Sequence, residues 1–216
     1  MKLYDSFGPN PRMVRMFMAE KGIELPAEEV DLLGGENRQQ AFAEKNPGAQ
    51  MPAMELDDGT VLAETTTMCQ YLEEKYPTPV IIGDTAESRA VSNMWVRRIE
   101  LGITEHIYNG FRYAEGLELF KDRLYCIPEA ADGLKAKAQD QLKWLDDLME
   151  GKEFIGGDRL GLADLILYCC LDFAQGVGQP LNPELKNINA WFARMDARPS
   201  AKASLHATAE AVGMKG

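Results

Sequence analysis

Residues 52–76, PAMELDDGTVLAETTTMCQYLEEKY, contain the clearest evidence for the fold. The first half, PAMELDDGTVLA, predicts two short strands joined at Asp58-Gly59, because this residue pair favours the tight turn of a β-hairpin. The second half has apolar residues at helical spacing and is followed by Pro77, which ends a helix. We therefore expect an antiparallel hairpin that leads directly into an amphipathic helix.

The preceding residues alternate between strand and helix signals. KLYD (residues 2–5) and AEEVDLL (residues 27–33) predict strands. PRMVRMFMAEKGI (residues 11–23) has a helical apolar stripe with Gly22 as a C-terminal stop, and NRQQAFAEKN (residues 37–46) predicts a short second helix. The resulting order, β-α-β-α-β-β-α, needs both parallel and antiparallel strand pairing.

Strand signals nearly vanish after residue 84. Amphipathic helical patterns cover most of the remainder, at residues 86–115, 129–150, 162–176 and 185–197. We therefore expect a small α/β domain over residues 1–80 and an all-helical domain over residues 86–216.

The composition limits the possible partners and location. The 216-residue chain carries a net charge of −11, which argues against nucleic acid and anionic membrane as partners. It lacks an apolar run near the ~18–20 residues of a membrane span, and its N-terminus lacks the apolar stretch of a signal peptide, so we expect a cytoplasmic protein. Four cysteines without a C-x-x-C pair and two histidines give no zinc-ligand spacing, so we expect no metal.

Four motifs, in this order, resemble those of the cytosolic glutathione transferase family, and the resemblance covers essentially the whole chain. They are NPGAQMP (residues 46–52), LAETTTMCQYL (62–72), IGGDRLGLADLILYCC (155–170) and WFARMDARPSAKAS (191–204). The resemblance implies a thioredoxin-like N-terminal domain that binds glutathione, an all-α C-terminal domain and a homodimer. It implies glutathione as a co-substrate.

The resemblance also implies where the glutathione backbone and its glutamyl end bind. It implies a cis peptide bond between Met51 and Pro52, which turns the Met51 N–H and C=O outward to pair with the cysteinyl backbone of glutathione, as an added strand would. Thr65 is expected to cap the following helix, whose first N–H groups would hold the glutamyl carboxylate. A buried Glu64 would accept from the glutamyl ammonium group. The alternative is a plain helix cap beside an exposed acid.

The glycine end of glutathione is expected to meet a second group of side chains. Gln50 precedes Met51, where the family often places Gln or Lys, and "GENR" resembles a family motif that puts Asn37 and Arg38 at ligand-facing positions. Arg38 would form a charge-assisted hydrogen bond with the glycine carboxylate. The alternative is two solvated side chains.

The loop DSFGPN (residues 5–10) lacks the residue that usually activates the thiol. In Ser-type members of the family the hydroxyl would fall at Gly8, and the Cys type fails because the first cysteine is Cys69. A Tyr-type interpretation would use Tyr4 but needs a one-residue gap. Ser6 lies two residues upstream of the expected place.

Asn10 is the remaining candidate in this loop. Gly8-Pro9-Asn10 resembles the Thr-Pro-Asn of a bacterial and fungal branch in which Asn serves the thiol, so we expect a bacterial member of this type. Asn10 would either cap a helix that starts near Pro11 or point its amide at the sulfur. A hydrogen bond to a charged group contributes about 1.5–3 kcal/mol and a helix N-terminus about 0.3–2 kcal/mol. Together they would lower a thiol pKa of about 8.5 by roughly 1.5–3 units, so the loop needs no nucleophile of its own.

The second substrate is expected between the domains, against Phe7 and the aromatic helix segment at residues 106–116. The side chains expected there are Tyr108, Phe111, Arg112 and Tyr113. Aromatic rings with one cation suit an apolar electrophile that is anionic or phenolic. The alternative is that these rings belong to the helix core, which their spacing also favours.

Two features of residues 161–170 have a structural interpretation. Cys169 and Cys170 are predicted to be helix-core residues. Asp164 lies three residues after the cap position, so it is predicted to form half of a capping box, with Gly161 as the cap residue.

These features predict an enzyme that activates bound glutathione as a thiolate for attack on an apolar electrophile, chemistry typical of detoxification. Two alternatives stay open. One is a glutathione-dependent disulfide or peroxide reductase, in which glutathione rather than a protein cysteine reacts. The other is a non-catalytic glutathione-binding protein in which Gly8 marks lost chemistry.

Overall fold

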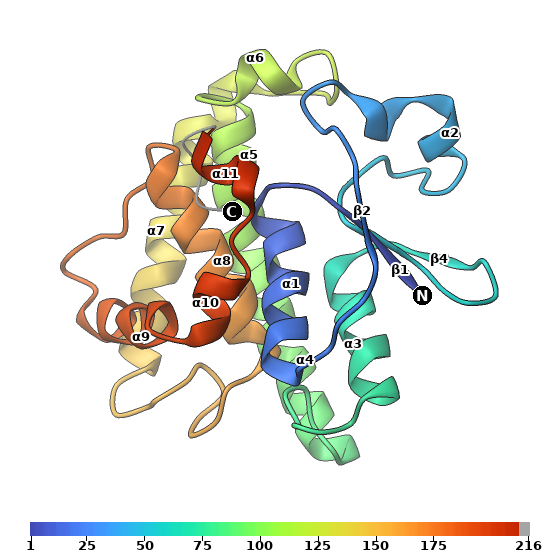
Figure 1. Cartoon of the computed structure of the whole chain (residues 1–216). Coiled ribbons are helices and arrows are strands. Elements are labelled where there is room, and N and C mark those ends of the chain that lie inside the picture. The colour runs from blue at the N-terminus through green and yellow to red at the C-terminus, as the bar shows by residue number, and fades with distance from the viewer. Residues whose placement is uncertain (212–216) are drawn as a thin grey trace. The chain divides into compact units, whose positions relative to one another are not determined.

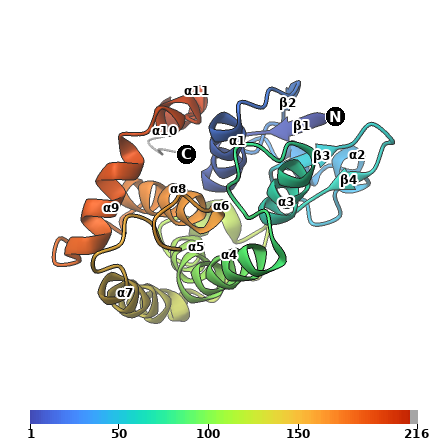
Figure 2. The same cartoon turned by 90° about the horizontal axis from the view of Figure 1, so that it is seen from below.

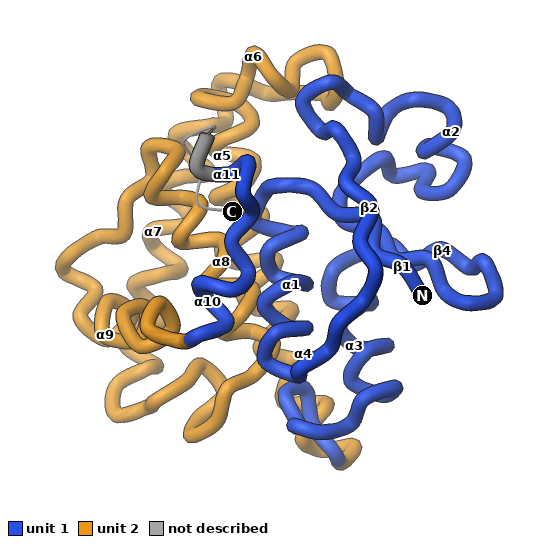
Figure 3. Tube along the Cα trace, in the orientation of Figure 1, with its two compact units in different colours: residues 1–84, 199–216 blue, residues 85–198 orange. Residues whose placement is uncertain are grey.

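The computed structural model describes residues 1–211 of the chain (Figure 1). These residues form two compact units (Figure 3). Unit 1 holds residues 1–84 together with residues 199–211, and unit 2 holds residues 85–198. Within residues 1–211, no helix has the length and apolar character needed to cross a membrane.

Unit 1 is built on a four-stranded mixed sheet with the order β2-β1-β3-β4. β1 (Lys2–Asp5) pairs parallel with β2 (Ala27–Glu29) and antiparallel with β3 (Ala53–Glu55), which pairs antiparallel with β4 (Val61–Leu62). The expected combination of parallel and antiparallel pairing is therefore confirmed. β2 is shorter than predicted, because the chain turns away from the sheet after Val30, whose N–H still donates to the Asp5 carbonyl at 2.9 Å.

Helices cover both faces of this sheet. Side chains alternate between the faces along a strand, so Tyr4 and Asp5 point in opposite directions. Tyr4 packs edge-on against Phe42 of α2 (Gln40–Ala43), with ring centroids 5.7 Å apart. Asp5 faces α1 (Pro9–Lys21), where it accepts from Arg15. α3 (Thr65–Lys75) packs beside α1, and Figure 2 shows the two helices on the side of the sheet away from α2.

α1 begins two residues earlier than predicted. Its N-cap is Gly8, with φ 122°, and Pro9 takes the first helical position, which suits the fixed φ and missing N–H of proline. Asn10 therefore lies inside the first turn, and the prediction that it caps a helix starting near Pro11 is wrong. The C-terminal stop at Gly22 is confirmed, because this residue takes the left-handed conformation with φ 64°.

The segment at residues 37–46 is less helical than predicted. A 3-10 turn, η1 (Glu36–Arg38), precedes α2, and the two are separated by Gln39, whose backbone is extended. Helix propensity alone does not stabilise a helix of four residues, so the stability of α2 depends on the burial of Phe42.

Residues 199–211, called the C-terminal arm below, pack with unit 1. α10 (Pro199–Ala203) lies against α1, and α11 (Ala207–Ala211) follows it (Figure 1). The expected division placed residues 86–216 in one helical domain. The structure differs because Arg12 and Arg15 of α1 donate to carbonyl groups of the arm, contacts that no local sequence pattern reveals.

Unit 2 consists mainly of helices. They are α4 (Ala86–Ile99), α5 (Glu105–Arg112), α6 (Leu117–Phe120), α7 (Ala131–Leu148), α8 (Leu162–Gly176) and α9 (Lys186–Asp196). The three predicted helices after residue 128 are confirmed within two residues at each end. The predicted helix 86–115 is interrupted by a π-helical segment, η2 (Glu100–Thr104), whose Gly102 approaches α7 so closely that a Cβ would lie 3.3 Å from Gln141 Oε1.

α8 forms the centre of unit 2. Its residues 162–174 are all buried, which fits its almost continuous apolar sequence. Cys169 and Cys170 are buried free thiols within this helix, which confirms their predicted core position.

Asp164 has the structural role that its position predicts. Its carboxylate accepts from the Gly161 N–H at 2.9 Å, which completes half of a capping box, and from the Ile155 N–H at 2.9 Å. Trp191 of α9 donates its indole N–H to the same carboxylate at 2.8 Å. Full burial raises the pKa of the Asp164 carboxyl to about 6, even though these three donors favour its ionised form.

Candidate functional site

The end of β1, the start of β3 and the end of β4 lie together along one edge of the sheet in unit 1, namely the edge that runs across the strand ends. The antiparallel registers, continued past the strand ends, place Ser6 beside Met51 and Glu64 beside Pro52. α1 follows β1 and α3 follows β4, so both helices start from this edge. The loop to Asn10, the Met51–Pro52 peptide and the start of α3 are therefore neighbours, and they form the candidate site.

Two buried asparagines hold the loop in front of β3. Asn46 donates to the Gln50 carbonyl at 2.8 Å, and Asn37 donates to the Ala49 carbonyl at 2.6 Å. The Met51–Pro52 peptide bond is cis, as the resemblance implied. The expectation that Asn37 faces a ligand is wrong, because its side chain is turned inward to support this loop. Asn46 was not singled out from the sequence, although an Asn-Pro pair is a turn signal.

Met51 presents its backbone to a ligand. Its side chain is buried in a cluster with Tyr4, Val30 and Phe42. Its N–H and C=O form no hydrogen bond within residues 1–211, because the strand ladder of β3 begins only at Ala53. An extended peptide can therefore pair with both groups, as a strand added to a sheet edge does.

The start of α3 provides three unused main-chain donors. Thr65, Thr66 and Thr67 are its first residues, their N–H groups have no partner within residues 1–211, and no side chain caps the helix. Thr65 was expected to be the cap but is the first helical residue, and the cap position belongs to Glu64. Three N–H groups at a helix N-terminus form a binding place for a carboxylate.

Glu64 differs from its expected state. It was expected to be buried, but its side chain is exposed. Its backbone has φ 66° and ψ 115°, a combination that residues with a Cβ rarely adopt. Such backbone strain occurs often at ligand-binding positions. The exposed Glu64 carboxylate is accessible to a cation at the N-terminus of α3.

Gln50 and Arg38 lie near the same loop. Gln50 has an exposed side chain directly before Met51. Arg38 ends η1 and is half-buried. Because Asn37, its neighbour in η1, is bonded to Ala49, Arg38 is held close to the loop that precedes β3.

Ser6 and Tyr4 both use their hydroxyl groups inside the protein. Ser6 is fully buried, and its Oγ donates to the Val30 carbonyl at 3.0 Å. Tyr4 is also buried, donates to Glu55 and accepts from Lys45 Nζ at 2.7 Å. Neither hydroxyl proton is left for a thiol, so both side chains have a structural role in this arrangement.

Asn10 is the polar side chain that stays available in this loop. It is half-buried, and its amide has no hydrogen-bond partner within residues 1–211. Pro9 and Pro11 have no N–H, and the Arg12 N–H donates to the Gly8 carbonyl at 3.1 Å. In the first turn of α1, Asn10 therefore supplies the unused main-chain N–H as well as the side-chain amide.

Comparison with known proteins identifies the family. Residues 7–75 match the family model described as "Glutathione S-transferase, N-terminal domain", and residues 128–194 match "Glutathione S-transferase, C-terminal domain". Glutathione S-transferase 2 of Saccharomyces cerevisiae is 30% identical over 210 residues, which cover 94% of this chain and 88% of that protein. The chain belongs to the glutathione S-transferase family.

Solved structures of glutathione S-transferases agree with the fold. The crystal structure of a glutathione S-transferase domain-containing protein from Marinobacter aquaeolei matches with a TM-score of 0.87 and 36% identity, covering 93% of this chain and 99% of that one. The crystal structure of Gtt2 from Saccharomyces cerevisiae matches with a TM-score of 0.88 and 31% identity, covering 95% and 100%. The expected thioredoxin-like domain followed by helices is thus the fold of this glutathione S-transferase.

The side chains that the sequence suggested for a second substrate in this glutathione S-transferase are partly core residues. Phe111 is buried between Phe120 and Phe173, with ring centroids 6.0 and 5.1 Å away. Tyr108 is half-buried, and desolvation raises its pKa well above the usual value, so it stays a neutral phenol. The Arg112 guanidinium lies 5.8 Å from the centroid of the Tyr108 ring.

The remaining two of these residues differ in burial. Phe7 of unit 1 is buried. Tyr113 is the C-cap residue of α5 and is half-buried. Tyr108, Arg112 and Tyr113 therefore keep some accessible surface, whereas Phe7 and Phe111 are buried.

Proposed function

We propose that this glutathione S-transferase binds glutathione along the edge of its sheet and stabilises the thiolate with Asn10. The cysteinyl backbone pairs with the N–H and C=O of Met51, and Pro52 shapes the turn. The glutamyl carboxylate binds the first N–H groups of α3, with the hydroxyl of Thr65 beside it. Glu64 accepts from the glutamyl ammonium group.

The other end of the tripeptide meets side chains of the preceding loop. Gln50 and Arg38 hold the glycine carboxylate. The observation that supports this whole orientation is the meeting of an unpaired strand-like backbone at Met51 with three unused N–H donors at α3, on one edge of the sheet.

Few groups in the loop can stabilise the thiolate, so the pKa of the bound thiol depends mainly on Asn10. Its main-chain N–H and its side-chain amide supply the donors of the first turn of α1. One hydrogen bond to a charged acceptor contributes about 1.5–3 kcal/mol, and each 1.36 kcal/mol corresponds to about one pKa unit. Asn10 alone can therefore make the bound thiol largely ionised near neutral pH.

The reaction that follows is a nucleophilic attack by the sulfur of glutathione. A new bond forms from this sulfur to an electrophilic carbon, and either a leaving group departs with its electron pair or an activated double bond takes up a proton. The thiol proton passes to solvent before the attack. No protein side chain forms a covalent bond.

Several parts of the proposal rest on the family. The electrophile is a small apolar molecule of the anionic or phenolic kind, contacted by Tyr108, Arg112 and Tyr113 of α5. We also propose a cytoplasmic homodimer of a bacterial Asn-type branch, with a role in detoxification.

Asn10→Ala tests the proposal. We expect the pKa of bound glutathione, read from the ultraviolet absorbance of the thiolate, to rise by about 1–2 units, and kcat for conjugation to a chlorinated aromatic to fall about 10–100-fold near neutral pH. Gln50→Ala should instead raise KM for glutathione with little change in kcat.

The same samples distinguish the alternatives. Wild-type reduction of a small mixed disulfide without conjugation would identify a glutathione-dependent reductase. Calorimetric binding of glutathione without turnover in either assay would identify a binding protein. No heat at millimolar glutathione would contradict the proposed site altogether.

A further inference from the structure

The loop that carries Asn10 is anchored at its base by Ser6. All three polar groups of this fully buried residue are engaged. Its N–H donates to Asp5 Oδ1 at 2.9 Å and its Oγ to the Val30 carbonyl at 3.0 Å. Its carbonyl accepts from Arg15 Nη1 at 2.9 Å. The position of the loop base is therefore set by Val30, the residue after β2, on one side and by Arg15 on the other.

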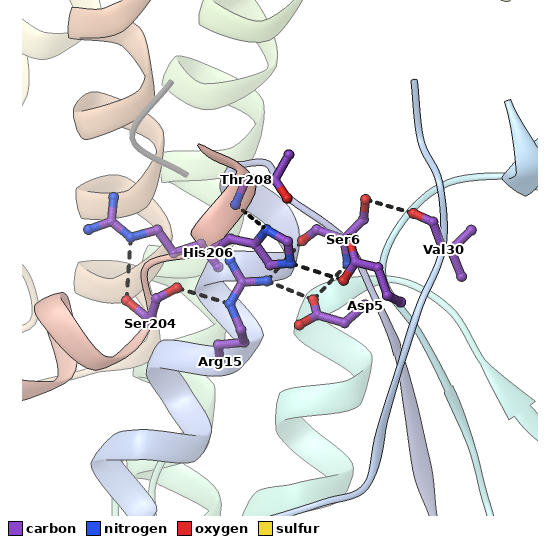
Figure 4. Close-up of polar contacts among 9 residues, drawn as sticks. Asp5, Ser6, Arg15, Val30, Ser204, His206 and Thr208 are labelled. Atoms are coloured by element: carbon purple, nitrogen blue, oxygen red, sulfur yellow. Dashed lines mark hydrogen bonds and ion pairs between the residues drawn. The ribbon is translucent and has the colours of Figure 1, made fainter. Parts of the chain in front are cut away.

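Arg15 connects this base to the C-terminal arm. Its Nη1 also donates to Asp5 Oδ1 at 2.7 Å, and its Nε donates to the Ser204 carbonyl at 2.9 Å. Figure 4 shows Arg15 between Asp5 and Ser204. The planar fork of arginine suits such a bridge, because its donors point in fixed directions to separate acceptors.

The arm also contacts the β2 side of the anchor. His206 lies 2.9 Å from Glu29 Oε2 through its Nε2, and its Nδ1 accepts from the Thr208 N–H at 3.2 Å (Figure 4). Glu29 is the neighbour of Val30, which receives the Ser6 hydroxyl. The arm therefore braces the loop base from both sides.

The chain between Ser6 and Asn10 needs this support from the arm. Gly8 has φ 122°, a conformation that few residues other than glycine adopt, and glycine gives the chain additional freedom there. A displacement of about 1 Å at a reacting group can cost about 10²-fold in rate. Asn10 is the main source of donors to the sulfur, so its placement depends on how firmly Ser6 is held.

We propose that Arg15, seated on the C-terminal arm, is a positioning residue that holds the Asn10 loop for activation of the thiol. Its effect on the thiolate rests on the function proposed above, whereas its effect on the loop does not. The arm, more than 180 residues from the loop in sequence, thereby becomes part of the catalytic support.

Arg15→Lys tests this role because lysine keeps the charge but loses the fork. We expect the pKa of bound glutathione to rise by about one unit and kcat at neutral pH to fall about tenfold, with KM for glutathione within about twofold. Amide hydrogen exchange at Arg12, whose N–H donates to the Gly8 carbonyl of this loop, should be faster than in the wild type. Ser200→Ala is the matched control, since it removes a partly buried hydrogen bond between the same arm and Glu20 of α1. It should leave all these values unchanged.

The outcomes separate the two proposals. Wild-type exchange at Arg12 and an unchanged thiol pKa in Arg15→Lys would overturn the positioning role. A wild-type protein without any thiolate absorbance would refute the proposed function and the catalytic part of this inference, while faster exchange in Arg15→Lys would still support the bracing of the loop. If thermal denaturation shows that Arg15→Lys does not fold, Asp5→Asn replaces it, because this substitution weakens the same bridge. The thiol pKa and the hydrogen exchange of Asp5→Asn then test the positioning role.

Discussion

At the scale of single residues, the two helix starts at the site differ because of their sequences. α3 starts with three threonines and no proline, so each of its first three residues keeps a main-chain N–H that is free for a ligand. α1 starts with Pro9, Asn10 and Pro11, so Asn10 alone supplies a main-chain donor there. The first arrangement suits a carboxylate, which takes several hydrogen bonds. In the second arrangement, Asn10 is the residue that can donate a main-chain hydrogen bond to the sulfur.

The backbone strain at Glu64 can be tested by substitution. Its φ of 66° costs about 1–3 kcal/mol for a residue with a Cβ, whereas glycine adopts it freely at an entropic cost of about 0.5–1 kcal/mol. We expect Glu64→Gly to have a free energy of unfolding about 1 kcal/mol higher than Glu64→Gln, as measured by urea denaturation.

The same pair separates stability from binding. Both variants lose the carboxylate proposed to meet the glutamyl ammonium group, so calorimetry should find weaker glutathione binding in both. A Glu64→Gly variant that is less stable than Glu64→Gln would show that the backbone at this position is not strained.

The site positions were predictable, but several of their roles were not. The motif around residues 46–65 located the Met51 backbone and the start of α3 because both depend on local chain geometry. The roles of Ser6, Tyr4 and Asn37 depend on partners distant in sequence. Ser6, for example, has its hydroxyl bonded to Val30, 24 residues away.

At the scale of elements, a buried ion pair joins α1, α3 and the segment that leaves unit 1. Lys21 Nζ lies 2.6 Å from Glu73 Oε2 and also donates to the Pro79 carbonyl. Glu73 Oε1 accepts from the N–H groups of Ile81 and Ile82 at 2.9 and 2.8 Å. One carboxylate therefore fixes the ends of two helices and the path of residues 79–83.

Lys21→Met removes the buried cation from this network. Glu73 is then left as a buried charge without its counter-ion, which costs about 3–5 kcal/mol in the free energy of unfolding. Chemical denaturation monitored by circular dichroism measures the loss. Lys121→Met, which breaks the exposed pair with Glu118, should show no measurable change. Equal stabilities for the two variants would contradict the role of the buried pair.

The order of elements was predictable, but some of their ends were not. The hairpin and α3 follow from turn chemistry and apolar spacing, which are local. The π-helical segment at residues 100–104 was not predicted, because the local sequence continues a helical pattern and does not show that Gly102 lies close to Gln141 of α7. The start of α1 was misplaced because Pro9 and Pro11 both suit the first turn of a helix.

At the scale of the whole molecule, unit 1 is completed by the two ends of the chain. The C-terminal arm seats Ala201 and Ser204 against α1, and both are buried. Arg12, which is buried too, donates to the Ala201 carbonyl at 3.2 Å and to Ser204 Oγ at 3.3 Å. The stability of unit 1 therefore depends on contacts with residues 201–204, far from α1 in sequence.

Ala201→Phe and Lys202→Phe form a matched test of this dependence. Both place the same ring in α10, but Ala201 is buried against α1 whereas Lys202 is exposed. Overpacking at residue 201 should cost about 1–3 kcal/mol and displace the arm. Hydrogen exchange should then accelerate in α1 and β2, because both lose contacts with the arm, while the Lys202→Phe variant keeps the wild-type pattern. If exchange in Ala201→Phe rises only within α10, the arm does not support α1 and β2, and its bracing of the Asn10 loop would lose its structural basis.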